Sequence, residues 1–262
     1  MRIVEPKVFL VGETRCISEG IHAYLNEIGA SQWRSDGASN DAEGLIELYG
    51  RGCYRSFHAG MNPNVTRVRE GNKEYIQNLL NQAHGSVLEH CTANFIFLHV
   101  SRVFTHELIT HRVGMAKSQE SLRFVRLDEL DFWMPPEIAS NPEAKQIFED
   151  AIKDGEERQR ELARIFDLDN PETPFTKKKQ LTSAMRRIAP EGLATMVGWT
   201  GNFRTLRHVI ETRTDPAAER EIRLVFGKVA EIAQQRWPHV FGDYTVTQED
   251  GLPVYSSMYH KV

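Results

Sequence analysis

The stretch Asn94–Val100, which reads NFIFLHV, decides the fold expected for this chain. Its nearly continuous run of apolar and aromatic residues is typical of a strand that is buried on both faces of a sheet. The residues directly after it, Arg102–His111, have the apolar spacing of an amphipathic helix. The apolar side of that helix consists of Val103, Phe104 and Leu108. A buried strand and an amphipathic helix in succession predict a sheet with helices packed on it.

Strands and helices are mixed along the rest of the chain without the regular rhythm of βαβ units. Further strands are expected at Val8–Val11 and Leu193–Thr200. Further helices are expected at Glu19–Ile28, Ala42–Tyr54, Lys73–Ala83, Lys145–Phe166 and Thr176–Arg187. A loop is expected at Pro135, Pro136 and Pro142, and Pro190 is expected to stop the helix Thr176–Arg187. We therefore expect an α+β fold with a mixed or antiparallel sheet and surrounding helices, in a single compact domain spanning residues 1–262.

Two later helices carry start signals. Asn202 precedes the helical spacing of Phe203–Thr212, and an asparagine in that place can cap a helix through its side-chain oxygen. Asp215 is followed by Pro216, a pair that favours the first turn of a helix. The second signal predicts a long helix that is capped by Asp215 and has Pro216 in its first turn.

The composition excludes several classes of protein. Hydrophobic residues make up 40% and charged residues 26% of the 262 residues, as in an ordinary globular protein with a sizeable core. The net charge of -4 argues against a general nucleic-acid binder, which needs a basic excess. No apolar run approaches the roughly 18 residues of a membrane-spanning helix, so no membrane span is expected.

The N-terminus and the cysteines favour a cytoplasmic protein. The apolar stretch within residues 1–16 is interrupted by charged residues and a proline, which is typical of a strand rather than a signal peptide. The three cysteines form no CxxC pair and no zinc spacing; they are Cys16, Cys53 and Cys91. An odd number of cysteines in a cytosolic setting favours reduced thiols over a disulfide framework.

A polar segment, Thr110–Phe124, follows the predicted helix and reads THRVGMAKSQESLRF. Its side chains supply many hydrogen-bond donors and few acidic groups; they are His111, Arg112, Lys117, Ser118, Gln119, Ser121 and Arg123. This cluster suits an anionic ligand such as a nucleotide, because the arginine fork binds phosphate or a uracil edge through two parallel hydrogen bonds. A solvated loop explains the same composition equally well.

The segment resembles the signature of flavin-dependent thymidylate synthases, which read Arg-His-Arg, seven or eight residues, then Ser-x-Arg. In this sequence His111-Arg112 is followed by eight residues and then by Ser121-Leu122-Arg123. Thr110 stands where the family usually has the first arginine, a flavin-side residue. The sequence does not reveal what takes the place of that arginine.

Other stretches resemble the family in the same order along the chain. Upstream, His84–His90 (HGSVLEH) resembles a His-x-Ser/Thr-x-x-Glu-His segment that precedes a strand and touches the flavin. Arg51–Tyr54 resembles an Ala-Arg-Val-Ser/Cys-aromatic stretch more weakly. Downstream, Arg186 lies four residues before Pro190, like an arginine that binds substrate phosphate. The family's Asn-x-Arg, Asn/His and final Arg positions are matched by Asn202-Phe203-Arg204, His208 and Arg213.

The resemblance implies a site for dUMP with two catalytic residues. Arg123 would hold the uracil and stabilise the negative charge that develops on its ring. Ser121 would bind and orient the substrate rather than attack it, since no Ser-His-Asp pattern is evident. Arg186 would bind the phosphate. The remaining substrate residues would be Glu107, Gln119, Leu122 and Arg213.

The resemblance also implies an FAD site and two further small molecules. NADPH would reduce the flavin, methylenetetrahydrofolate would give the one-carbon unit, and reduced flavin would supply the hydride. The family shares its FAD and dUMP sites between the subunits of a homotetramer, which is therefore expected here. No role follows for the tail after Pro238, which could pack on a neighbouring subunit. The FAD residues would be Cys53, His84, Ser86, Glu89, Thr110, His111, Arg112, Val113, Asn202, Arg204 and His208.

Other chemistries find less support in the residues. Thymidylate synthases of the cysteine-dependent class need a nucleophile, and neither Cys53 nor Cys91 has the surroundings of one. The pairs His84 with His90 and His106 with His111 invite a metal site, but they lack the i, i+4 spacing of a helical zinc pair, so no metal is expected. No GxGxxG motif is present, so a Rossmann-type cofactor site is not expected.

Two rival functions stay open on the sequence. Thr110 and Glu107 keep open a related flavin-dependent pyrimidine nucleotide hydroxymethylase. A nucleotide-binding protein without catalysis is the other rival. The retention of four arginines argues against that loss; they are Arg123, Arg186, Arg204 and Arg213.

Overall fold

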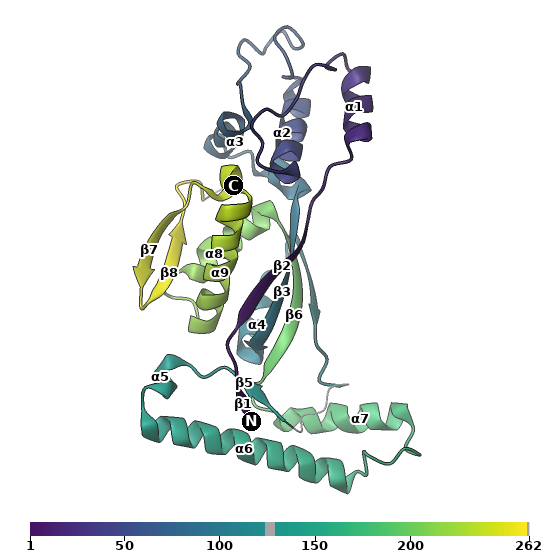
Figure 1. Ribbon diagram of the computed structural model, residues 1–262, viewed down its shortest axis with the longest axis vertical. Coiled ribbons are helices and arrows are strands. Elements are labelled where there is room, and N and C mark those ends of the chain that lie inside the picture. Colours follow the sequence, from purple (N-terminus) through teal and green to yellow (C-terminus); the bar gives the residue numbers. More distant parts are fainter. Residues whose placement is uncertain (124–128, 261) are drawn as a thin grey trace.

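A four-stranded antiparallel sheet forms the centre of the computed structural model (Figure 1). The structure describes residues 1–123, 129–260 and 262, so Phe124, the last residue of the polar segment, lies outside the described residues. The strand order is β2 (Lys7–Glu13), β3 (Thr92–Ser101), β6 (Ala194–Asn202) and β4 (Met115–Gln119). The prediction of an α+β fold with an antiparallel sheet is confirmed. The strand β4 lies inside the polar segment, which is therefore not a plain solvated loop.

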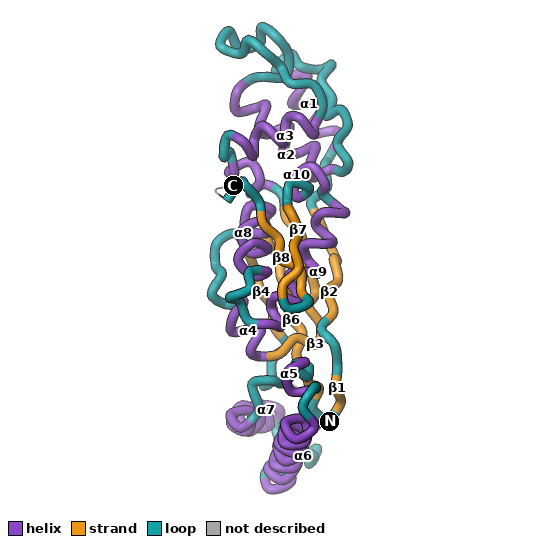
Figure 2. The backbone as a smooth tube through the Cα atoms, turned by 90° about the vertical axis from the view of Figure 1, so that its left-hand side faces the viewer, coloured by secondary structure: helices purple, strands orange, loops and turns teal. Residues whose placement is uncertain are grey.

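Two helices, α8 (Phe203–Thr214) and α9 (Arg220–Arg236), lie along one side of this sheet (Figures 1 and 2). On this side Phe226 of α9 meets Trp199 of β6 edge-on, with ring centroids 5.8 Å apart. Buried residues alternate with half-buried ones along β3 and β6. The prediction that Asn94–Val100 is buried on both faces is therefore wrong, because its alternate side chains point away from α8 and α9.

Helices extend the molecule beyond both ends of the sheet (Figure 1). One end carries α1 (Ser18–Glu27), α2 (Asp41–Tyr54) and α3 (Asn72–Asn81). The other carries α5 (Pro136–Ala139), α6 (Pro142–Ile165), α7 (Phe175–Met185) and the parallel pair β1 (Arg2–Ile3) and β5 (Asp131–Phe132). Pro142 was expected in a loop but is the first residue of α6, where a proline costs no hydrogen bond. No helix in the described ranges is long and apolar enough to cross a membrane.

The helix after β3, α4 (Arg102–Leu108), is tied to α9 by a buried carboxylate. Ser101 caps α4, since its Oγ accepts a hydrogen bond of 3.0 Å from the backbone N–H of Phe104. The backbone N–H of Ser101 donates to Glu221 Oε1 at 2.6 Å, and its hydroxyl donates to Oε2. The helix ends at Leu108 and not at His111 as predicted, so His111 lies in the turn that follows.

Glu221 makes the stability of the fold dependent on pH. Burial raises the pKa of its carboxyl from 4.5 to about 7, although the bonds from Ser101 oppose the rise. Since the native state binds this proton more tightly than the unfolded chain, the free energy of unfolding falls as pH rises through that interval. Glu221→Gln imitates the protonated acid, so its free energy of unfolding should not fall in this way. The difference in free energy of unfolding between variant and parent is therefore expected to shift by roughly 3 kcal/mol in favour of the variant as pH rises from 4.5 to about 7.

Urea unfolding of parent and variant at the two ends of that interval checks this expectation. Glu231→Gln, on an exposed position of the same helix, is the matched control and should leave the pH dependence unchanged. A stability difference between Glu221→Gln and parent that stays constant with pH would refute the prediction.

The turn between α8 and α9 confirms one predicted cap and corrects the other. Asn202 caps α8, with its Oδ1 accepting from the backbone N–H of Thr205 at 2.8 Å. The predicted start of α9 at Asp215 is wrong, because the N-cap is Glu219 and the helix begins at Arg220. Asp215 instead accepts a 2.8 Å hydrogen bond from the N–H of Ala217 in the turn. Aspartate before proline suits such a turn as well as a helix start, which explains the error.

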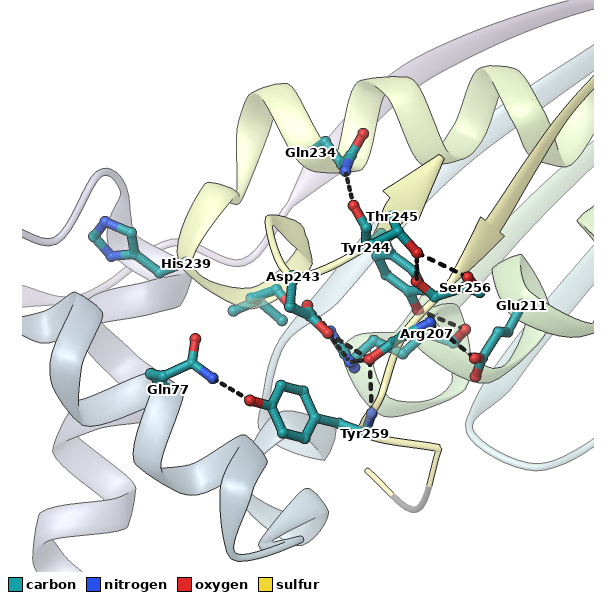
Figure 3. A network of polar contacts seen from close by, with 12 residues as sticks. Gln77, Arg207, Glu211, Gln234, His239, Asp243, Tyr244, Thr245, Ser256 and Tyr259 are labelled. Carbon is teal, nitrogen blue, oxygen red and sulfur yellow. Dashed lines mark hydrogen bonds and ion pairs between the residues drawn. The ribbon is translucent and has the colours of Figure 1, made fainter. Parts of the chain in front are cut away.

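The final part of the chain packs on its own α8. After α10 (Pro238–Phe241), a hairpin forms from β7 (Thr245–Glu249) and β8 (Leu252–Ser256). Figure 3 shows Arg207 of α8 beside Asp243, which accepts two hydrogen bonds from it at 2.7 and 2.8 Å. Ser257 accepts from Arg207 at 3.1 Å and donates to Asp243 at 2.5 Å. The tail that had no role on the sequence is therefore part of the support of α8.

Candidate active site

A cavity of about 370 Å³ lies where the polar segment meets the start of α8. The turn before β4 contributes one wall, and the end of β6 with the first turns of α8 contributes the other. The cavity is lined by Glu89, Thr110, His111, Arg112, Val113, Met115, Asn202, Arg204, Thr205, His208 and Val209. Most of the residues that the resemblance assigned to FAD therefore meet in one place.

The turn is fixed to α8 by backbone hydrogen bonds. The carbonyl of Gly114 accepts from the N–H of Asn202 at 2.8 Å, and the carbonyl of Val113 accepts from Thr205 Oγ1 at 2.8 Å. Gly114 has φ of +68°, and a Cβ there would lie 2.2 Å from Thr205 Oγ1. Only glycine fits a turn that needs both this backbone conformation and this approach. The wall formed by residues 110–114 is thus held against the helix start.

Arg213, near the end of α8, connects the two walls. Its Nε donates to His111 Nε2 at 2.7 Å and its Nη1 donates to Glu107 Oε2 at 2.6 Å. Its Nη2 donates to the carbonyl of Glu107 at 3.0 Å and to Thr110 Oγ1 at 2.8 Å. Burial, followed by the charge of Arg213, lowers the pKa of His111 to about 4. The imidazole of His111 is therefore neutral at physiological pH.

The cavity suits an anionic ligand with ring systems. Arg112 and Arg204 bring positive charge to it, whereas the N–H groups of Phe203 and Thr205 at the start of α8 already donate to the Cys91 carbonyl and to Asn202 Oδ1. Arg204 also pairs with Glu89, Nη1 to Oε1 at 2.6 Å, which fixes the position of its guanidinium. Within the described part of the chain, no group of three His, Cys, Asp or Glu side chains is placed to hold a metal ion.

Comparison with known proteins identifies the family. A family described as thymidylate synthase complementing protein matches residues 37–239. The flavin-dependent thymidylate synthase of Corynebacterium diphtheriae is 34% identical over 230 residues, covering 87% of this chain and 89% of that one. The enzyme of the same name from Mycobacteroides abscessus is 34% identical, covering 82% and 86%. The chain belongs to the flavin-dependent thymidylate synthase family.

Solved structures agree with this membership at the level of the fold. The UMP/dUMP methylase PolB from Streptomyces cacaoi, bound with 5-Br dUMP, superposes with a TM-score of 0.63 at 15% identity, covering 92% of this chain and 96% of that one. Thymidylate synthase X from Helicobacter pylori, with FAD and dUMP, gives a TM-score of 0.55 at 17% identity, covering 90% and 99%. At these identities the likeness concerns the fold alone.

The residues that the resemblance to flavin-dependent thymidylate synthases assigned to dUMP do not lie together in this chain. Arg123 is exposed beyond the end of β4, and Arg186 is exposed at the end of α7. Gln119 ends β4, with its Nε2 3.4 Å from Thr105 Oγ1. Ser121 Oγ accepts from the backbone N–H of Arg123 at 3.4 Å. Two further side chains in this set, Glu107 and Arg213, belong to the His111 cluster instead.

Leu122 is the one predicted substrate residue whose side chain points into the protein. It is 6% exposed and belongs to a hydrophobic cluster with Leu130, Phe132, Ile152 and Leu193. Its side chain therefore anchors the segment that carries Ser121 and Arg123. Only its backbone is left to contact a ligand.

Strand β4 separates the two groups of predicted site residues. Met115 pairs with Gly201 beside the start of α8, whereas Gln119 pairs with Val197 farther down the sheet. A strand rises about 3.4 Å per residue, so the two ends of β4 lie roughly 13 Å apart. The cavity beside α8 and the Ser121–Arg123 stretch are thus at opposite ends of this strand.

Three predicted FAD residues lie outside the cavity. Cys53 is exposed at the end of α2 and lines an apolar cavity of about 700 Å³ with Tyr24 and Tyr49. His84 stacks on Tyr54, with ring centroids 5.7 Å apart, and lines a separate cavity of about 400 Å³. Ser86 is exposed on the 3₁₀ helix Gly85–His90.

The sequence reasoning missed three residues of the cavity, namely Met115, Thr205 and Val209. Thr205 had a detectable signal, because it stands three residues after the cap Asn202, where a side chain meets the helix start. Met115 and Val209 are apolar residues that line the cavity through their position on β4 and α8. No sequence signal separates them from residues of the core.

Proposed function

We propose that this chain converts dUMP to dTMP, with methylenetetrahydrofolate as carbon donor and NADPH as reductant through bound FAD. The observation that carries the proposal is the single cavity formed by Thr110–Val113 and the start of α8. It unites most of the residues expected at the flavin, and the family membership gives that cavity its chemistry. Residues 1–262 are treated as one functional unit, and the expected cytoplasmic location stays a prediction.

The residues of the cavity fit a flavin nucleotide. Arg112 and Arg204 would bind its diphosphate, because charge-assisted hydrogen bonds from arginine stabilise phosphate. His111, His208 and Asn202 would supply hydrogen bonds to its neutral rings. Bound flavin supplies a hydride when reduced. The protein's own part is to hold the cofactor in place and to exclude water around it.

The substrate would be bound by the second group of residues. Arg123 would hold the uracil and stabilise charge on the ring, and Arg186 would bind the phosphate. Ser121, Gln119 and the backbone of Leu122 would orient the base. Glu107 and Arg213 would contact the substrate from the His111 cluster, where Arg213 has one N–H left after its four hydrogen bonds.

A homotetramer with shared sites explains why these groups are apart within one chain. In such an assembly another copy would bring the group from one end of β4 next to the group from the other end. Several large apolar side chains are exposed, among them Val113 at 86%, Ile17 at 74% and Val11 at 57%. Such side chains favour burial against another surface. Cys53, His84 and Ser86 would then join the flavin site across the same contact.

An anaerobic reaction tests the proposed function. The purified protein is incubated with dUMP, methylenetetrahydrofolate, NADPH and FAD, and the nucleotide product is identified by mass spectrometry. Formation of dTMP only when FAD is present is the expected result. A hydroxymethylated nucleotide would replace the proposal by the rival hydroxymethylase. Binding of dUMP without any product from folded protein would favour the rival that lacks catalysis.

A further inference from the structure

We propose that Arg213 is a positioning residue that holds His111 as a neutral imidazole with its proton on Nδ1, so that the ring offers an N–H donor to the bound flavin. The statement about the ring stands on this chain's own contacts. Only its use toward flavin rests on the function proposed above. The same contacts also answer what stands in for the family arginine at Thr110.

The hydrogen bond between Arg213 and His111 has one possible direction. A guanidinium has only N–H donors and keeps its charge at all physiological pH values. Arg213 Nε lies 2.7 Å from His111 Nε2, so this ring nitrogen must be the acceptor. An imidazole that accepts at Nε2 is neutral and carries its proton on Nδ1. The arginine therefore selects the tautomer of the ring, and together with burial it keeps the ring neutral.

Arg213 cannot turn away from this position without losing several bonds. Its other contacts go to the carboxylate and carbonyl of Glu107 and to the hydroxyl of Thr110. Its side chain is 13% exposed, so the guanidinium itself is largely removed from water. The threonine hydroxyl also donates to the carbonyl of Glu107 at 2.8 Å, which orients its oxygen toward the arginine. Four bonds from one guanidinium fix the direction of its Nε–H.

Thr110 has a function in this arrangement. An arginine side chain at position 110 would bring a second cation to Arg213 and would remove the oxygen that accepts from it. With threonine there, the guanidinium of Arg213 reaches the position from α8 and supplies positive charge beside His111.

The remaining charges around His111 leave the neutral ring in place. His208 of α8 faces it at a centroid distance of 6.0 Å. Lys117 of β4 donates to the His111 carbonyl at 2.8 Å. His208, Lys117 and Arg213 disfavour a positive charge on the ring. Glu107 of α4 is the acidic group that favours it. Since Glu107 is already bonded to Arg213, its charge is largely compensated.

The Nδ1 proton is left for a ligand. No side chain or carbonyl in the described ranges accepts a hydrogen bond from His111 Nδ1, and His111 lines the cavity. The carbonyl groups and ring nitrogens of a flavin are acceptors that such a donor can meet. A charged imidazole would instead add a second cation beside Arg213 and repel it.

Nitrogen NMR of the ligand-free protein tests the tautomer directly. The protein is labelled with ¹⁵N in its histidine rings, and His111 is assigned among the ten histidines by its loss in His111→Gln. Its ring is expected to show a protonated Nδ1 and a bare Nε2, unchanged from about pH 5.5 to about pH 8, where free histidine titrates. A protonated Nε2, or a ring that gains charge within that range, would overturn the proposal.

Variants then assign the effect to Arg213. In Arg213→Met the ring is expected to populate both tautomers, because no donor then fixes Nε2 as the acceptor. Arg112→Met removes a neighbouring cation that makes no contact with the ring, and it should leave the spectrum of His111 unchanged. A His111 spectrum that stays the same in Arg213→Met would contradict the role given to the arginine. If that variant does not fold, the spectrum of the parent protein still decides the tautomer.

The inference about the tautomer of His111 and the proposed function can be refuted separately. FAD-dependent dTMP formation by a protein whose His111 carries its proton on Nε2 would remove this inference and leave the function standing. A neutral His111 ring with its proton on Nδ1, in a protein that forms no dTMP, would remove the proposed function and leave the tautomer of His111 standing.

Discussion

Replacing Arg123 by alanine is expected to lower the rate of dTMP formation by about a hundredfold or more, which is the usual loss when one donor to a developing negative charge is removed. The melting temperature should stay the same, because this side chain is exposed and its neighbour Leu122 is the one that anchors the segment. Steady-state kinetics with saturating FAD, together with thermal unfolding, measure both quantities.

A second exposed arginine provides the control for this variant. Arg158 lies on α6, where it pairs with Asp154 and Glu161 of the same helix. Arg158→Ala removes the same charge from a surface outside the proposed site, so its turnover should equal that of the parent. Normal turnover in Arg123→Ala would mean that the substrate site has been assigned to the wrong segment.

Replacing Asp243 by asparagine is expected to lower the free energy of unfolding by about 3 kcal/mol, because it leaves a buried arginine without its counter-charge. The side chains of Arg207 and Asp243 are only 2% and 8% exposed. Burial alone would raise the pKa of Asp243, but the hydrogen bonds and charge of Arg207 lower it below its ordinary value. The Nε of Arg207 already has no partner in the described part of the chain. Urea unfolding measures the loss.

The same substitution at Asp250 serves as the matched control. Asp250 is 66% exposed and approaches the buried Arg223 at 3.6 Å, and Arg223 also donates to the carbonyl of Glu249 at 2.9 Å. Because this carboxylate lies in water and Arg223 keeps its bond to Glu249, the contact is expected to contribute about 1 kcal/mol or less, and Asp250→Asn should change stability little. If both variants lowered the free energy of unfolding equally, the contact between Arg207 and Asp243 would contribute no more than the contact between Arg223 and Asp250.

The elements that follow from local patterns could be predicted from the sequence. The strands β2, β3 and β6 and the helices α1, α2, α3, α6 and α7 appear within a few residues of their expected positions. Asn202 was recognised as a cap because its chemistry acts on the N–H groups directly after it. The cap of α9 failed because Asp215 and Glu219 both precede the helix, and only the packed turn decides between them.

The candidate site could be predicted only as a set of residues, since its geometry depends on contacts distant in sequence. The bond between Arg213 and His111 joins residues 102 positions apart, and no periodicity reports it. Strand β4 was hidden because its residues are mostly exposed, so it lacks the apolar alternation by which strands are found. The family resemblance named residues at both ends of β4 but did not show that one chain keeps them apart.

The support of α8 by the hairpin has a consequence for how the protein is made. Arg207 contacts Asp243, which lies 36 positions later in the sequence, and Ser257, which lies 50 positions later. During synthesis the helix that forms a wall of the cavity therefore emerges from the ribosome well before the residues that neutralise its buried cation. The cavity wall that α8 forms is therefore expected to reach its final support only after Asp243 and Ser257 have been translated. A nascent chain that stalls before Asp243 would hold an uncompensated arginine at its centre and be a substrate for proteolysis.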